Sequence, residues 1–84
     1  RLAACVNIVP GIESWFWGKG KTDRAHEYLL IIKTTVPRFE RLRQVVVSHH
    51  PYDVPEVIAC SLSRGHRPYL RWLAESVSSS PPHP

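Results

Sequence analysis

Two adjacent histidines, His49 and His50, carry the clearest metal-binding chemistry of this sequence. Imidazole nitrogen is a good ligand for copper, nickel and zinc. Neighbouring residues on a regular helix point about 100° apart, so a shared ion needs an irregular backbone, which Pro51 supplies by disfavouring helical geometry at the residue before it. The alternative is structural, because a histidine in the last turn of a helix interacts favourably with the helix dipole. The pair therefore predicts either a metal site or a stabilised helix terminus.

The two cysteines, Cys5 and Cys60, are too few and too far apart for a disulfide framework or a Cys-x-x-Cys zinc site. A thiolate at Cys5 would favour copper(I), whereas the alternative for both residues is packing within an apolar run. We expect reduced thiols and a cytoplasmic setting, with the secretory pathway or the mitochondrion left open because residues that precede Arg1 would carry any address signal.

A second polar group consists of Lys33, Tyr52 and Glu56. Lys33 follows Leu29 and Ile31 on one face of a strand, so its charge is expected to need a carboxylate partner. Glu56 is the predicted partner in a structural ion pair. Alternatively, the three residues would form the polar lining of a small-molecule or anion pocket.

Four aromatic side chains are expected to lie at an interface: Trp15, Phe16, Trp17 and Trp72. The first three are consecutive, so in a strand they project to both faces, and a small monomer cannot cover them all. Stacking on nucleic-acid bases is the competing interpretation. We favour contacts between copies of the chain.

The composition of the 84 residues fits one small α+β domain, with 43% apolar and 21% charged residues. The net charge of +4 is spread along the chain, so no nucleic-acid partner is expected. The longest apolar run is far shorter than the roughly 20 residues of a membrane span, so no direct membrane insertion is expected. The common enzyme templates, such as Gly-x-Ser-x-Gly and His-Glu-x-x-His, are missing, which argues against catalysis.

Hydrophobic periodicity predicts the order strand, strand, helix, strand, helix. Residues 4–17 are expected to form a strand with a bulge at Pro10 and Gly11, followed by a loop over residues 18–23 and a second strand over residues 25–35. A helix capped by Thr35 is expected to end near His49.

The remainder of the chain is predicted to hold a third strand, a last helix and a tail. The strand covers residues 54–61, and the helix opens at Pro68 with Leu70, Leu73 and Val77 as its apolar stripe. A domain is thus expected over residues 1–77, with a disordered Ser/Pro-rich tail over residues 78–84.

Four segments in this order resemble the CutA divalent-cation tolerance family. They are residues 1–14 (RLAACVNIVPGIES), 32–35 (IKTT), 50–58 (HPYDVPEVI) and 68–72 (PYLRW), and the resemblance extends over residues 1–77. It implies a ferredoxin-like fold, a split β-α-β sheet similar to that of the PII proteins with helices on one face. It also implies a homotrimer, a link to copper and other divalent metals in bacteria, and no catalytic activity.

The resemblance places a bacterial copper site at His49 and His50, with a cysteine from an opening strand as partner. For animal members it implies a part in the processing or localisation of acetylcholinesterase, so a protein-interaction or trafficking scaffold is the alternative function. A nucleic-acid-binding ferredoxin-like module is a distant third.

Two departures from the family pattern affect these expectations. Lys19 and Lys21 surround Gly20 at the hairpin turn, where family members carry an acid, so an ion pair at that carboxylate is in doubt. The opening strand and most of the first helix are not present in the sequence, which predicts a truncated member whose residues 54–61 lack a neighbouring strand. We therefore expect the isolated chain to fold poorly unless another segment fills this gap.

Overall fold

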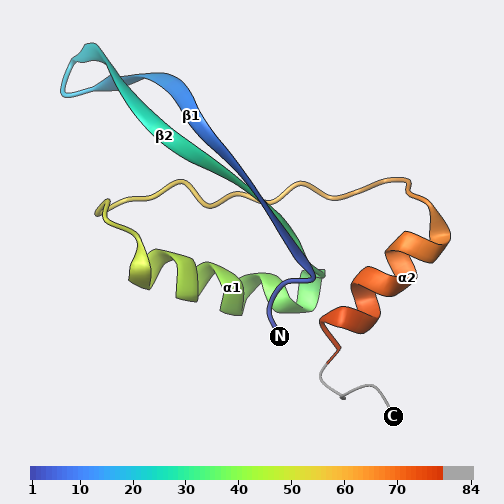
Figure 1. The fold of residues 1–84 in the computed structure, drawn as a ribbon. Helices are drawn as coiled ribbons and strands as arrows, with labels where there is room; N and C mark the ends of the chain where they lie inside the picture. Colours follow the sequence, from blue (N-terminus) through green and yellow to red (C-terminus); the bar gives the residue numbers. More distant parts are fainter. Residues whose placement is uncertain (79–84) are drawn as a thin grey trace.

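The computed structural model describes residues 1–78 and has the element order β1, β2, α1, α2. Strands β1 (Cys5–Gly18) and β2 (Lys21–Lys33) form a long antiparallel hairpin, which is the whole sheet of the described residues (Figure 1). Cys5 lies opposite Lys33 at its base, and Gly18 lies opposite Lys21 at its tip. The predicted hairpin is confirmed.

The hairpin contains the expected bulge and a shorter turn than expected. Its register shifts between Val9 and Ile12, where Gly11 has a φ of +68°, a value that glycine adopts without steric cost. The turn is Lys19–Gly20, with φ values of 52° and 77°. Residues 21–23 belong to β2, so the predicted loop over residues 18–23 was wrong, because a two-residue turn with positive φ at both positions matches the twist of the strands.

Helix α1 (Val36–His49) has the predicted limits. Pro37 stands in its first turn, where its missing N–H is tolerated. Thr35 occupies the N-cap position with extended backbone angles but makes no side-chain cap hydrogen bond, which corrects the predicted capping. His50 is extended, with φ −81° and ψ 141°, as expected for a residue that precedes a proline.

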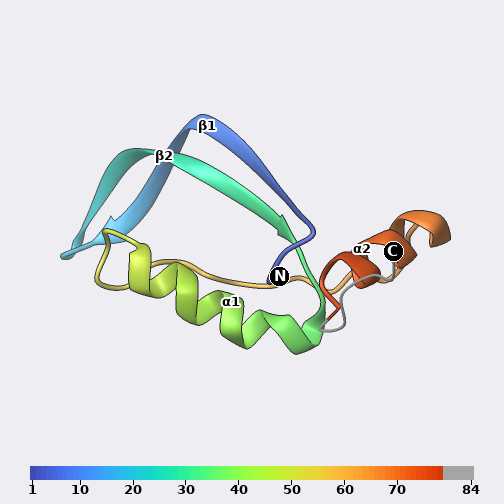
Figure 2. The same ribbon diagram turned by 60° about the horizontal axis from the view of Figure 1, so that its bottom comes forward.

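The third strand predicted over residues 54–61 is not formed. This stretch is extended, but within residues 1–78 no strand lies beside it to accept or donate ladder hydrogen bonds. In both views the segment between the helices runs back along α1 toward α2 (Figures 1 and 2). Its apolar side chains are open to solvent, with Val54 90% and Ile58 74% exposed. The sequence pattern was that of a strand, but a strand also requires a neighbour.

Helix α2 (Arg67–Ser76) and the residue that follows it contribute the small core of the described residues. Leu73 is 5% and Val77 2% exposed, and both belong to the predicted apolar stripe. The Arg38 Nε atom donates a hydrogen bond of 2.8 Å to the carbonyl of Val77 and so connects the two helices. None of the helices in residues 1–78 has the length and apolar character that crossing a membrane requires. Apart from Ser78, the predicted tail lies outside the described residues.

Candidate functional site

His49 is the last residue of α1, and its imidazole is held by the helix itself. Its Nδ1 atom lies 2.9 Å from the carbonyl oxygen of Val45 and 3.1 Å from the hydroxyl of Ser48. The Ser48 hydroxyl in turn donates to the same Val45 carbonyl at 2.8 Å. The ring is therefore fixed on its Nδ1 side, and the residue is exposed to solvent.

His50 follows in extended conformation and makes a different set of contacts. Its Nδ1 atom accepts the backbone N–H of Tyr52 at 3.1 Å, and the two rings lie with their centroids 4.8 Å apart. The predicted irregular geometry before Pro51 is present. It gives the two adjacent histidines separate partners.

Tyr52 connects this turn to the hairpin. Its hydroxyl donates to Glu27 Oε2 on β2 at 3.0 Å. Hydrogen bonds from Ser14 and then from Tyr52 hold the pKa of the Glu27 carboxyl below its ordinary value, and a smaller attraction from His50 acts in the same direction. The hydrogen bond that Glu27 accepts from Tyr52 raises the pKa of the Tyr52 hydroxyl, because ionisation of that hydroxyl would place a second negative charge beside the carboxylate.

Glu27 was not among the predicted site residues. The available signal was its position: side chains alternate along a strand, so Glu27 shares a face with Leu29, Ile31 and Lys33. Tyr52 reaches this acid on β2 and makes no polar contact with Glu56 within residues 1–78.

The predicted ion pair between Lys33 and Glu56 is not formed in the described part of the chain. Lys33 is half-buried at the base of the hairpin, whereas Glu56 lies exposed in the unpaired segment after α1. Because residues 54–61 form no strand beside β2, nothing brings the carboxylate to the lysine.

Cys5 is not brought to the histidines within the single chain. It lies opposite Lys33, and the chain passes from Lys33 through two residues into the start of α1. His49 ends that helix of 14 residues, which is roughly 21 Å long at 1.5 Å per residue. Residues 1–78 contain no group of three or more His, Cys, Asp or Glu side chains that could hold a metal ion together. Cys60 is exposed, in contrast to the predicted packing role.

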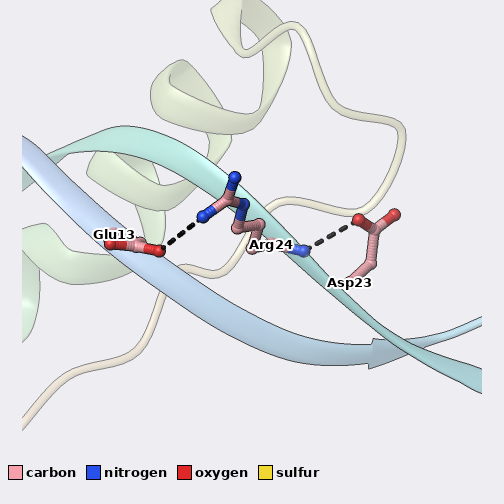
Figure 3. A network of polar contacts seen from close by, with 3 residues as sticks. All are labelled: Glu13, Asp23 and Arg24. Atoms are coloured by element: carbon pink, nitrogen blue, oxygen red, sulfur yellow. Dashed lines mark hydrogen bonds and ion pairs between the residues drawn. The ribbon is translucent and has the colours of Figure 1, made fainter.

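The four aromatic residues predicted at an interface are open to solvent. Trp15 is 64% exposed, Trp17 75%, and Phe16 and Trp72 about half. The guanidinium carbon of Arg24 lies 5.6 Å from the centroid of the Trp15 ring. The Arg24 side chain also pairs with Glu13 at 3.3 Å, and its backbone N–H donates to Asp23 (Figure 3). The Trp72 ring lies beside the Tyr69 ring, with the centroids 5.6 Å apart and the planes tilted by 40°. One chain alone leaves these surfaces uncovered.

The hydrogen bond between Tyr52 and Glu27 predicts a pH-dependent contribution to stability. The folded-state pKa of Glu27 is lowered, so its contribution is present above about pH 4.5 and is lost as the pH falls through the folded-state pKa. The pKa of Tyr52 is raised, so its contribution is present below about pH 10 and is lost as the pH rises through the folded-state pKa. At concentrations where copies of the chain associate, thermal unfolding of the Tyr52→Phe variant should therefore show its largest loss of Tm near neutral pH and none at either extreme.

The Tyr69→Phe variant is the matched control, because the Tyr69 hydroxyl has no hydrogen bond within residues 1–78. It should follow the parent chain at every pH. A Tm loss in Tyr52→Phe that persists unchanged at pH 3 would contradict the assignment.

Comparisons with known proteins all point to the same protein family. The family model of the CutA1 divalent ion tolerance protein matches residues 1–76. "Protein CutA 1, chloroplastic" of Oryza sativa is 51% identical over 80 residues, which are 95% of this chain and 45% of that protein. The divalent-cation tolerance protein CutA of Thermus thermophilus is 47% identical over 77 residues, which are 92% of this chain and 75% of that protein.

Solved structures agree with the sequence relatives. The divalent cation tolerance protein of Thermus thermophilus superposes with a TM-score of 0.89 at 46% identity, covering 93% of this chain and 76% of that chain. CutA1 of Oryza sativa gives a TM-score of 0.88 at 52% identity, and the match covers 94% of this chain and 72% of the rice chain.

This chain spans about half the length of several curated relatives, including 46% of human Protein CutA. The relatives are named for different compartments: the rice protein as chloroplastic and the solved Archaeoglobus fulgidus protein as periplasmic. The two strands and two helices of the present chain, together with its structural neighbours, define an α+β fold of the ferredoxin-like, PII-like type. On this sequence and structural similarity, the chain belongs to the CutA1 divalent ion tolerance family.

Proposed function

We propose that this chain is the subunit of a homotrimeric binding protein that takes up divalent metal ions weakly, copper foremost, as part of a metal-ion response. The observation that carries the metal assignment is the pair of adjacent imidazoles at the end of α1, in a chain whose relatives are named for divalent-cation tolerance. The function is binding, without catalysis.

The two imidazole side chains at this end of α1 are of a chemical type that binds such ions. Imidazole nitrogen suits copper, nickel and zinc. The described residues offer no third donor of the His, Cys, Asp or Glu type in the same place, which is why we propose weak binding. Cys5 lies at the opposite end of α1, so it would join the site only through another copy of the chain.

The trimer is supported by the apolar surface that one chain leaves open. Both faces of the hairpin expose large side chains: Ile8 is 62% exposed on one face and Leu29 45% on the other, in addition to the aromatic residues near the tip. Contiguous apolar surface of this kind is typical of protein interfaces. Trp15, Phe16, Trp17 and Trp72 are proposed as contacts between subunits. Lys33, Tyr52 and Glu56 would then form a polar pocket only at a cleft between subunits.

A copper titration tests the metal assignment. The double variant His49→Ala/His50→Ala should lose at least about tenfold in affinity for Cu²⁺, because the proposed imidazole donors are removed. The matched control His26→Ala/His66→Ala also removes two histidines, one on β2 and one before α2, and should bind like the parent chain. Equal affinity of the parent and of the His49→Ala/His50→Ala variant would overturn the assignment.

A second candidate function is a protein-interaction or trafficking scaffold with no physiological metal. The exposed aromatic residues favour it, since they offer a large contact surface whether or not an ion is bound. Copper titration separates the two candidates: a stable trimer that takes up no copper supports the scaffold.

A further inference from the structure

We propose that the segment between α1 and α2 forms a charged, head-to-tail contact between copies of the chain, in which the acidic end of one copy meets the arginine end of the next. The acidic end consists of Asp53 and Glu56, and the arginine end consists of Arg64 and Arg67. The proposal rests on the homotrimer proposed above. It goes further by naming the charged residues that fix how neighbouring subunits are placed.

Neither end of the segment has an ionic partner within residues 1–78. The salt bridges in this part of the chain lie on the hairpin and on α1. The four residues of the two ends are all exposed, and their side chains make no hydrogen bond with residues 1–78. Charges of both signs are therefore available to another molecule.

The extended backbone of the segment keeps its two ends apart. Glu56 and Arg64 are eight positions apart in the sequence, which corresponds to roughly 26 Å of extended chain. In both views the backbone between them runs along α1 toward α2 (Figures 1 and 2). An ion pair requires its charged atoms to lie within about 4 Å of each other. The acids of one copy can therefore pair with these arginines only in a second copy.

The arginine end lies in a stretch with an excess of positive charge. Residues 57–74 contain three arginines and no acidic residue. One of the three, Arg71, has Glu75 one turn further along the same helix. Arg67 is the first residue of α2, whose first turn holds no acid, and the helix dipole disfavours a cation at this position. A carboxylate from another copy relieves this repulsion, and arginine can bind it through two parallel N–H donors.

Exposed apolar side chains lie beside both ends of the segment. Val54 and Ile58 flank the acidic end, and the neighbouring rings of Tyr69 and Trp72 follow the arginine end. Ion pairs that stay in water contribute little, whereas close pairs that an interface removes from water can contribute substantially. Trp72 is one of the residues proposed above as a contact between subunits, so the charged contact would be continuous with that surface.

The proposed trimer requires two unlike surfaces on each copy. In a closed ring of three identical chains, every copy meets its two neighbours through different surfaces. If either end of the segment met the same end of another copy, like charges would face each other at a considerable cost. The acidic end and the arginine end together supply the complementary pair of surfaces that the ring needs.

Charge reversal tests this contact. The acid variant Asp53→Lys/Glu56→Lys and the arginine variant Arg64→Glu/Arg67→Glu should each raise the dissociation constant of the assembly at least about tenfold, as measured by sedimentation velocity. Both variants place like charges across the contact. The chain with all four substitutions has opposite charges there again, so its dissociation constant should return to within about threefold of the parent value.

The variant Arg1→Glu/Arg41→Glu is the matched control. It changes the net charge as much as the arginine variant does, at two exposed arginines outside the segment, and it should assemble like the parent chain. If the acid variant is weakened and the arginine variant is not, the acids contact some other base and the proposed pairing is wrong. A chain with all four substitutions that assembles no better than the two reversals also contradicts the pairing.

The same measurements separate this contact from the homotrimer. A parent chain that sediments as a trimer, with reversals that have no effect, would retain the trimer and refute the charged contact. A parent that forms a dimer, weakened by both reversals and restored by their combination, would retain the contact and refute the trimer. A parent that stays monomeric at every concentration would refute both.

Discussion

At dilutions where copies of the chain separate, we expect circular dichroism to record thermal unfolding without a cooperative transition. Cooperative unfolding requires a packed interior whose loss is all-or-none. Within residues 1–78 only Leu73 and Val77 are buried hydrophobic residues, while most of the large apolar side chains of the hairpin are exposed. Ordering the backbone costs conformational entropy at every residue, and so small a core cannot offset it.

The backbone after α1 leads to the same expectation. Residues 53–65 take part in no backbone–backbone hydrogen bond within the described part of the chain. As a single chain they are solvated, and their extended conformation has no ladder to hold it. Apolar side chains such as Ile58 and Leu62 stay in water as well.

Raising the protein concentration should restore a sharp transition, with a midpoint that rises with concentration, because association covers the exposed hairpin. Sedimentation velocity at each concentration identifies the species that melts. A two-state melt by a species shown to be monomeric would contradict this expectation and with it the need for a second copy.

The elements that the sequence predicted correctly are those determined by neighbouring residues. Gly11 marks the bulge of β1, and Pro51 keeps His50 extended, so that α1 ends at His49. The first turn of α2 contains Pro68, as expected. In each case a local steric rule fixes the backbone, so no knowledge of the tertiary arrangement is needed.

The errors concern features that depend on distant residues. Residues 54–61 have the pattern of a strand, yet strand formation needs a partner that the described residues do not supply. Conversely, the polar residues at the start of β2 do form a strand, since the aromatic residues of β1 lie opposite them in register. The bond between Tyr52 and Glu27 was missed for the same reason: it depends on where the turn after α1 meets the hairpin.

The double variant Trp15→Thr/Trp17→Thr is expected to dissociate the proposed trimer. Side chains alternate along a strand, so these two residues lie on one face of β1, where they are 64% and 75% exposed. Covering one large apolar side chain contributes roughly 1.5–3 kcal/mol. Losing two should weaken the attachment of each subunit by roughly 3–6 kcal/mol, or roughly 100- to 10,000-fold in dissociation constant. Threonine keeps a high strand propensity, so the hairpin itself should be retained.

The variant Lys21→Thr/His26→Thr separates loss of the interface from a general effect of substitution on the hairpin. Both of its positions are exposed in β2, and neither side chain is one of the large apolar groups. Sedimentation equilibrium should find this control variant at the mass of three chains and the tryptophan variant at the mass of one. If the tryptophan variant stays trimeric at micromolar concentration, the hairpin tip lies outside the interface. The contacts between copies would then have to come from the apolar residues at the base of the hairpin, where Ile8 and Leu30 face each other in register and are about half exposed.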